Sequence, residues 1–290
     1  MKTSNQTLPT ILIRTIRLVL HLIYGVTVAV VYPRLNRDRQ MEIQKNWSKT
    51  LLSIFNIPLD IQDEQFISCP DGCLQIANHV SWMDIFVLNA IQPSHFIAKS
   101  EVRDWPIIGW LCRRSGTLFI ERASRQGATA ISQQIVEKLR KGERIGLFPE
   151  GTTTDGRQVG TFRPSLLQSA IDANSIVSPV AICYQDRDGN LSSNAPFTGD
   201  TTLVESIWNM LSGRQIFARV TFAPPLQAGS DDRRALSNRA HQVIAHKLGT
   251  IGKRANNNAT DEAEETVARG ILSRPEFSLL FDTTLYQLPD

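Results

Sequence analysis

The sequence has no large excess of charge of either sign. Its 31 lysines and arginines and 28 aspartates and glutamates leave a formal net charge of +3 over 290 residues. Domains that bind nucleic acid concentrate far more positive charge on one face or along one helix. We therefore expect no nucleic-acid partner, although a mildly basic surface remains compatible with anionic lipid headgroups.

Cysteine is scarce and scattered. The four cysteines are Cys69, Cys73, Cys112 and Cys183, with no CxxC pair and no clustered histidines beside them. Structural zinc sites and disulfide frameworks both need such patterns, so we expect neither, and no bound metal. Reduced cysteines are typical of a protein that faces the cytosol.

Several motifs that identify enzyme classes are missing. The sequence contains no GxGxxG, no P-loop, no HExxH and no GxSxG. It therefore gives no support for dinucleotide binding, P-loop chemistry, a zinc peptidase or a serine nucleophile on a strained turn.

The sequence has no uninterrupted apolar run long enough to cross a bilayer. Residues 18–32 are almost entirely apolar, but a spanning helix needs about 20 such residues. Extending the run back to Leu8 includes Arg14 and Arg17. A signal peptide is also a poor match, because no small-x-small cleavage site precedes Pro33.

We expect residues 1–36 to form a membrane-anchoring helix, either shallowly embedded or tilted across the bilayer. Basic residues flank the apolar run on both sides, so their distribution predicts no orientation. The alternative is a buried amphipathic helix of a soluble fold.

Beyond Pro33, short apolar segments alternate with segments of helical periodicity. We expect helices over 38–55, around 131–139 and around 236–244, and strands at 57–61, 74–77, 96–98, 117–120, 145–148, 176–183 and 216–222. Pro58 would confine the first strand to a sheet edge. This alternation predicts an α/β fold with a mixed central sheet layered with helices, preceded by the N-terminal helix.

The most informative residues are His79 and Asp84, in the segment NHVSWMD at 78–84. A histidine beside a carboxylate is typical of a general base that activates a hydroxyl. Five residues on a helix place two side chains about 140° apart. The pair can therefore meet only if His79 lies on the turn before a helix and Asp84 in its first turns. Ser81 is a candidate N-cap for that helix.

The segment NHxxxxD resembles the first motif of the glycerolipid acyltransferases, the family that includes lysophosphatidic acid acyltransferase. GTLFIER at 116–122, FPEGT at 148–152 and VSPVA at 177–181 look like its second, third and fourth motifs, in the same order. The resemblance covers about a third of the chain. It implies an acyltransferase domain at 37–253. The polar composition after Arg254, with three consecutive asparagines, predicts a linker and C-terminal tail at 254–290.

The resemblance also implies roles for individual residues. His79 would take the proton from an acceptor hydroxyl, and Asp84 would hold the imidazole and stabilise its charged form. Arg122, in the second motif, would bind a phosphate with its planar guanidinium. Glu150 follows an apolar strand, at the end where open α/β sheets place their sites. It would orient the acceptor or hold Arg122.

Further candidates complete the expected substrate-binding site. Backbone amides near His79 or at Gly151 and Thr152 would stabilise an oxyanion, and the sequence does not choose between them. Arg163 stands where relatives often have a basic residue, but Pro164-Ser165 replace the glycine that usually follows soon after. Lys99, after the strand at 96–98, is a further candidate.

The implied reaction moves a fatty acyl chain from acyl-CoA or acyl-ACP, a co-substrate rather than a cofactor, to the hydroxyl of a lysophospholipid. The favoured acceptor is 1-acyl-sn-glycerol-3-phosphate, giving phosphatidic acid. Another lysolipid, such as a lyso-ornithine lipid, is an alternative acceptor, and a lipid hydrolase or thioesterase is an alternative activity. A non-catalytic lipid-binding module is disfavoured by the joint presence of His79 and Asp84. We expect a membrane-associated protein with its active site facing the cytoplasm, and acyl carrier protein is a possible partner.

Overall fold

The computed structural model describes residues 6–67, 71–121, 125–229 and 232–251. Arg122, Cys69 and the expected linker and tail at 254–290 lie outside these ranges. The proposed domain boundaries stay a prediction.

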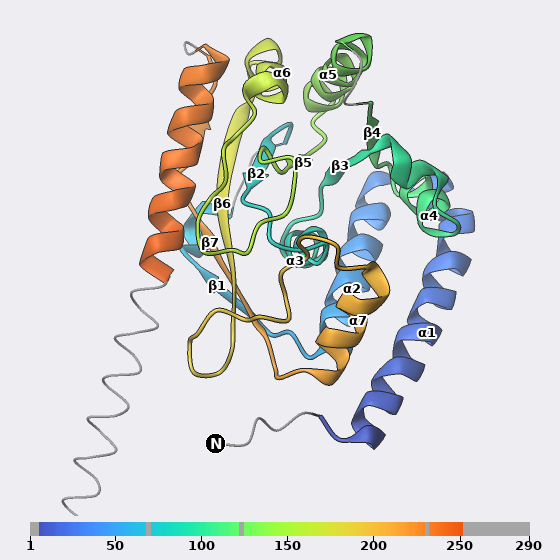
Figure 1. The fold of residues 1–290 in the computed structure, drawn as a ribbon. Coiled ribbons are helices and arrows are strands. Elements are labelled where there is room, and N and C mark those ends of the chain that lie inside the picture. The colour runs from blue at the N-terminus through green and yellow to red at the C-terminus, as the bar shows by residue number, and fades with distance from the viewer. Residues whose placement is uncertain (1–5, 68–70, 122–124, 230–231, 252–290) are drawn as a thin grey trace, which may run out of the picture.

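An eight-stranded mixed sheet forms the centre of the molecule (Figure 1). The strand order is β1-β7-β6-β2-β5-β3-β4, and β8 pairs with β6. All neighbours are parallel except β6–β7 and β6–β8. The strands are β1 (Leu59–Gln62), β2 (Leu74–Ala77), β3 (His95–Lys99), β4 (Leu118–Ile120), β5 (Ile145–Leu147), β6 (Ile176–Gln185), β7 (Phe217–Phe222) and β8 (Leu226–Gln227).

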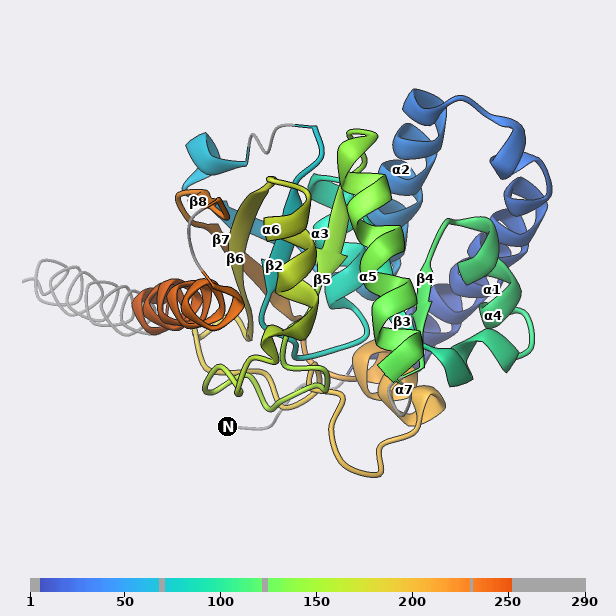
Figure 2. The ribbon, with the colours of Figure 1, turned by 90° about the horizontal axis from the view of Figure 1, so that it is seen from above.

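Helices cover both faces of this sheet, so the predicted α/β fold is confirmed. They are α1 (Leu8–Val31), α2 (Arg37–Phe55), α3 (Asp84–Ile91), α4 (Ile108–Arg114), α5 (Arg125–Arg140), α6 (Gln168–Asp172), α7 (Leu203–Ser212) and a helix at 233–251. Short 3₁₀ turns are η1 (Tyr32–Arg34), η2 (Glu64–Phe66), η3 (Ser100–Asp104) and η4 (Pro164–Leu167). One apolar cluster joins α2, α3 and α7 to the sheet, and a second joins α5, α6 and the helix at 233–251 (Figure 2).

The strand β6 shows why the buried strands read as continuous apolar runs. Val180, Ile182 and Tyr184 belong to the first cluster, whereas Ala181 and Cys183 belong to the second. Alternate side chains of a strand point to opposite faces, and helices bury both faces here. The strand therefore needs apolar residues at nearly every position.

The carboxyl ends of four strands meet at one edge of the sheet. The strands β2, β5, β3 and β4 are neighbours in that order and run parallel. In an open α/β sheet, this edge is where ligands bind. His79 and Glu150 follow β2 and β5 at this edge, and Lys99 is the last residue of β3.

Most predicted elements are present, with small shifts at their ends. The helix expected at 38–55 is α2, and the strand expected at 57–61 begins after Pro58 as β1, at the edge of the sheet. The predicted cap is wrong: α3 begins at Asp84, and the buried hydroxyl of Ser81 has no hydrogen-bond partner among the described residues. Asp84 itself accepts the backbone N–H groups of Val80 and Ser81, so its carboxylate, not a serine hydroxyl, holds the turn before α3.

The expectation of four reduced cysteines is wrong, as Cys73 shows. Cys73 is disulfide-bonded, whereas Cys112 and Cys183 are free thiols. Burial raises the pKa of the Cys183 thiol to about 11. That thiol is therefore protonated and unreactive at neutral pH.

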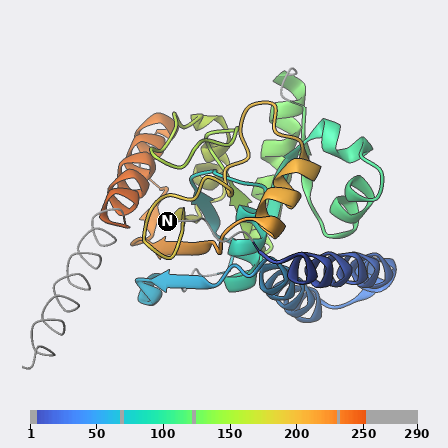
Figure 3. The same ribbon diagram turned by 60° about the horizontal axis from the view of Figure 1, so that its bottom comes forward.

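The N-terminal helix lies along α2 at the periphery of the molecule (Figure 3). The imidazole of His21 stacks on the indole of Trp47 with 4.5 Å between ring centroids, and His21 Nε2 lies 3.0 Å from the Trp47 carbonyl oxygen. On its other sides α1 exposes a long row of apolar side chains. With η1 it forms a segment of 27 residues, Leu8–Arg34, that is long and apolar enough to cross a membrane.

Candidate active site

The turn that carries His79 begins with a side chain that extends the sheet. Asn78 follows the last residue of β2, and its amide both donates to the carbonyl of Ile182 (2.9 Å) and accepts from the Ile182 N–H (2.8 Å). Asn78 is completely buried, so neither bond competes with solvent. It therefore fixes the point at which the chain leaves the sheet towards His79, a role that the motif alone did not reveal.

The predicted meeting of His79 and Asp84 is observed. Asp84 Oδ2 lies 2.7 Å from His79 Nδ1, and the same oxygen accepts the N–H of Val80 (2.7 Å) and of Ser81 (3.0 Å). Because the backbone donors require an accepting carboxylate oxygen, Nδ1 is the donor in the pair. In the neutral imidazole, Nε2 then carries the lone pair of a base.

The ring of His79 is also held from one side. It stacks on Phe148, with 4.0 Å between centroids and 7° between planes. Phe148 in turn stacks on Phe96 of β3, at 5.5 Å. The side chain of His79 is 19% exposed, so the ring is packed but still reaches solvent.

Glu150 supports the same turn from the end of β5. Its Oε1 accepts the N–H of His79 (2.9 Å), and its Oε2 accepts the N–H of Gly160 (3.2 Å). Burial raises the pKa of Glu150 above its ordinary value, because the charged form is desolvated, and this outweighs the two backbone hydrogen bonds. Glu150 therefore ties the His79 turn to the loop that follows β5.

That loop brings Arg163 close to the site. Gly151 has a φ of +71°, a conformation that favours glycine, and a methyl group at its Cα would lie 3.5 Å from Arg163 Nε. The Arg163 N–H donates to the carbonyl of Pro149 (2.9 Å). Its guanidinium is exposed and has no ion-pair partner within the described parts of the chain. Arg163 is thus a cation beside Gly151 that no acidic side chain of the described residues pairs with.

Most of the amides expected to stabilise an oxyanion are already engaged. Those of His79, Val80 and Ser81 donate to the carboxylates of Glu150 and Asp84, and that of Gly151 donates to the carbonyl of Phe148. Thr152 is exposed, and its N–H has no acceptor among the described residues. Of the expected amides, Thr152 is the one that remains available.

Lys99 lies at the same sheet edge, farther from His79. It is the exposed last residue of β3, which β5 separates from β2. The strand that precedes Arg122, β4, is the next one outward, and its Ile120 pairs with Lys99. In residues 6–67, 71–121, 125–229 and 232–251, no three His, Cys, Asp or Glu side chains are placed to hold a metal ion.

Sequence reasoning missed Tyr184, whose hydroxyl donates to Asp84 Oδ1 at 2.7 Å. The residue lies on β6, 100 positions from Asp84. A tyrosine in a buried strand has no local pattern that distinguishes it from an ordinary core residue.

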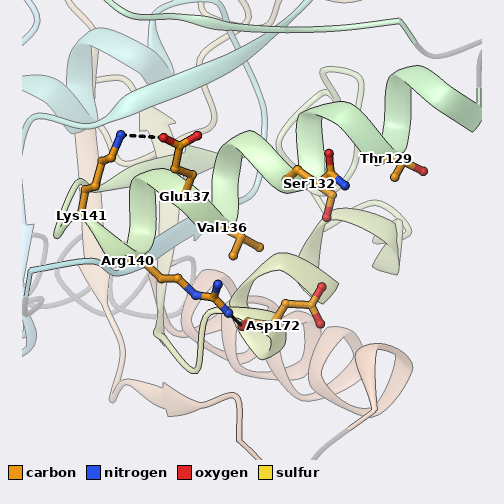
Figure 4. A pocket seen from close by; sticks show the side chains of 8 residues that line it. Thr129, Ser132, Val136, Glu137, Arg140, Lys141 and Asp172 are labelled. Carbon is orange, nitrogen blue, oxygen red and sulfur yellow. Dashed lines mark hydrogen bonds and ion pairs between the residues drawn. The ribbon is translucent and has the colours of Figure 1, made fainter.

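A groove of about 640 Å³ lies between α5 and α6 (Figure 4). Its cations are already engaged: Lys141 Nζ pairs with Glu137 at 2.6 Å, and Arg140 donates to the Asp172 carbonyl at 2.7 Å. None of the predicted site residues lines it. The candidate active site therefore stays assigned to the region around His79.

Residues 59–183 match the family described as Acyltransferase, and this range includes every site residue that the sequence predicted. The lyso-ornithine lipid O-acyltransferase of Pseudomonas aeruginosa is 42% identical over 182 residues, which cover 63% of this chain and 69% of that protein. The 1-acyl-sn-glycerol-3-phosphate acyltransferase of Neisseria meningitidis is 39% identical over 176 residues, covering 60% of this chain and 69% of that one. The chain belongs to this acyltransferase family.

The fold of this acyltransferase is also similar to a solved one. The crystal structure of PlsC, the 1-acyl-sn-glycerophosphate (LPA) acyltransferase of Thermotoga maritima, matches with a TM-score of 0.56 at 23% identity. The match covers 82% of this chain and 97% of that one. At this identity the likeness supports the fold alone.

Ionisation of Glu150 should destabilise the acyltransferase as the pH rises. Because its pKa is raised on folding, the folded state keeps the Glu150 proton to higher pH than the unfolded state. From the ordinary glutamate pKa, about 4.3, up to the raised value, the folded state binds more protons, so the free energy of unfolding falls with pH. Glu150→Gln removes the titrating group. In urea unfolding, the free energy of unfolding of the wild type minus that of Glu150→Gln should fall as the pH rises across that window. A difference that stays constant or rises would contradict this prediction.

Proposed function

We propose that this acyltransferase transfers a fatty acyl group from a thioester to the hydroxyl of a lysolipid, with His79 as general base. The observation that carries the proposal is the geometry of one ring. Asp84 engages Nδ1, Phe148 packs the ring face, and Nε2 has no partner within the described residues. A free Nε2 on an oriented imidazole is what the deprotonation of an acceptor hydroxyl requires.

The proposed reaction balances without a covalent enzyme intermediate. The acceptor oxygen gives its proton to His79 Nε2 and attacks the carbonyl carbon of the thioester. The carbonyl oxygen becomes an oxyanion, for which the Thr152 N–H is the proposed donor. The C–S bond then breaks, and the thiolate takes the proton from Nε2. The buried charge of Asp84 stabilises the imidazolium between these steps.

The favoured acceptor is 1-acyl-sn-glycerol-3-phosphate, with phosphatidic acid as product. A phosphomonoester calls for cations, and Arg163 and Lys99 lie exposed at the carboxyl edge of the sheet. Arg122 is a further candidate from the sequence. The second candidate acceptor is a lyso-ornithine lipid, because a relative 42% identical carries that name. The donor is acyl-CoA or acyl-ACP, with acyl carrier protein as partner in the second case.

Attachment to a membrane is part of the proposal, since such acceptors lie in membranes. α1 contacts α4 and α7, and all three regions expose apolar side chains. We call these the apolar surface: Leu8, Leu12, Ile13, Ile16, Val19, Leu20, Leu22, Ile23, Tyr24, Val30 and Val31 of α1, Trp105, Ile107 and Ile108 at α4, and Val204 and Trp208 of α7. An apolar surface of this extent favours a lipid interface. Cytoplasmic orientation of the active site is proposed with it.

The apolar surface predicts a specific change in membrane binding. Ile16, Leu20 and Ile23 are 51%, 61% and 57% exposed, so replacing all three by glutamate should leave the fold intact. Each buried side chain contributes about 1.5–3 kcal/mol to the transfer from water, so the triple variant should no longer sediment with phospholipid vesicles.

The matched control adds three negative charges elsewhere, at exposed glutamines of α5 and the helix at 233–251: Gln133→Glu, Gln134→Glu and Gln242→Glu. The control should sediment with vesicles like the wild type. If the α1 variant also does so, another surface carries the attachment.

If His79 is the base, His79→Ala should lower kcat at least about 100-fold, the usual range for loss of a general base. Acyl transfer is measured with purified protein, an acyl thioester and a lysolipid, and the free energy of unfolding is measured alongside. His246→Ala, at an exposed position of the helix at 233–251, is the control. Near-normal transfer by His79→Ala would end the proposal, and thioester hydrolysis independent of lysolipid would favour a thioesterase instead.

The acceptor is tested by removing one cation. Hydrogen bonds to charged groups are worth about 1.5–3 kcal/mol, so Arg163→Gln should lower kcat/KM for 1-acyl-sn-glycerol-3-phosphate by roughly 10- to 150-fold. The KM for the thioester should change far less, and Arg122→Gln should behave in the same way. A lyso-ornithine lipid has no phosphate and should lose little.

Arg157→Gln is the control for this test, because Arg157 is an exposed arginine of the same loop that pairs with Asp155 at 3.4 Å. It should leave both acceptors unaffected. The phosphate assignment fails if the wild type prefers the lyso-ornithine lipid, or if Arg163→Gln lowers the use of both acceptors equally. The acyl-transfer chemistry would survive either result.

A further inference from the structure

The two oxygens of the Asp84 carboxylate are held in different ways. Oδ2 accepts from His79 Nδ1 and from two backbone amides of the same turn. Oδ1 accepts from the hydroxyl of Tyr184 at 2.7 Å, its one donor among the described residues. Asp84 has no exposed surface, so water cannot replace a lost donor. The orientation of Oδ1 therefore depends on Tyr184.

Tyr184 is itself rigidly placed. It pairs with Ala218 of β7 and is 3% exposed. The ladder between β2 and β6 ends at Ala77 and Val180, so the last residues of β6 run on beside the His79 turn. Asn78 bonds to Ile182, and Tyr184 lies two residues further along, on the same face of the strand. The strand thus delivers the hydroxyl to the first residue of α3.

The hydroxyl of Tyr184 stays a donor under all working conditions. Burial, and then the neighbouring Asp84 charge, raise the pKa of Tyr184 well above its ordinary value. A neutral phenol beside a buried carboxylate can only donate to it. In the described structure, the groups that face the His79–Asp84 pair with titratable side chains are Tyr184 and Glu150.

We propose that Tyr184 is a positioning residue of the acyl-transfer reaction: it holds Asp84 Oδ1 so that Oδ2 stays on His79 Nδ1 and Nε2 faces the acceptor. The proposal rests on the role of His79 proposed above. Without the hydroxyl, the carboxylate can rotate about its last bond, and the imidazole then loses its fixed direction. The reaction step should suffer, whereas binding of the two substrates should not.

Tyr184→Phe tests this with a minimal change, because only the hydroxyl is removed. Three donors still hold Oδ2, so we expect kcat to fall roughly 10-fold, the lower end of what loss of a hydrogen bond to a charged group produces. KM for thioester and lysolipid should stay within about twofold, since Tyr184 is buried and its hydroxyl is bonded to Asp84. The more concentrated charge on Asp84 should also favour the imidazolium, so the acidic limb of the kcat/KM profile should move to higher pH.

The matched control is Tyr32→Phe. Tyr32 is 7% exposed, and its hydroxyl donates to the Gln40 carbonyl at 3.3 Å, in the connection between α1 and α2. The Tyr32→Phe protein should be less stable than the wild type, with the same kcat and the same pH profile. On an Asp84→Asn background, Tyr184→Phe should lower the residual rate less than about twofold, because no charge remains to be held.

A Tyr184→Phe protein with wild-type kcat and pH profile would overturn the inference, as would a fall in kcat that is matched by Tyr32→Phe and follows the loss of stability. If Tyr184→Phe does not fold, Tyr184 is replaced by 3-fluorotyrosine, which keeps the ring and makes the hydroxyl a stronger hydrogen-bond donor. An unchanged kcat and pH profile of that protein would then overturn the inference.

His79→Ala, assayed in parallel, separates the two proposals. Acyl transfer by His79→Ala at a near-normal rate would refute the proposed function. If His79→Ala is inactive and Tyr184→Phe transfers acyl groups at the wild-type rate, only the role of Tyr184 is refuted.

Discussion

The Asp84 carboxylate has no contact with solvent, and this places a strict demand on its surroundings. A buried charge is tolerated only where hydrogen bonds replace its hydration, and an unpaired one is strongly destabilising. Two amides of the preceding turn, one ring nitrogen and one phenol meet that demand. Because two of these donors belong to the turn itself, the charge also shapes the backbone that presents His79. The His79–Asp84 pair and the local fold are therefore one arrangement.

Around this charge the site is built mainly from the ends of strands. The parallel strands β2 and β5 deliver His79 and Glu150 to one edge, and the longer β6 supplies Tyr184 and the partner of Asn78. Glu150 then binds the His79 amide, so a carboxylate that looks available for substrate also holds the backbone. The exposed groups nearby, Arg163 and Thr152, lie on the loop after β5. The sheet thus positions the His79–Asp84 pair, and the loop carries the exposed groups beside it.

The sequence predicted what depends on local pattern and on motif spacing. The strands, the helices and the meeting of His79 with Asp84 follow from periodicity and from a five-residue interval, and the structure agrees. The cap at Ser81 was wrong because α3 begins only at Asp84, whose carboxylate accepts the two amides of the preceding turn. Tyr184 and the backbone bond of Glu150 were not predictable, since they join residues 100 and 71 positions apart through side-chain reach alone. No pattern within a short segment of the sequence predicts such contacts.

The dependence of the His79 turn on β6 has a consequence for how the protein is made. Asn78 binds Ile182 across 104 residues, and these bonds form only after β6 has joined the sheet. Contacts so distant in sequence form late and slowly, because the intervening loop must first be closed. During synthesis, the N-terminal part emerges from the ribosome with its histidine and carboxylate but without the strand that orders them. A nascent chain or a fragment that ends before β6 is therefore expected to carry the motif and yet be inactive.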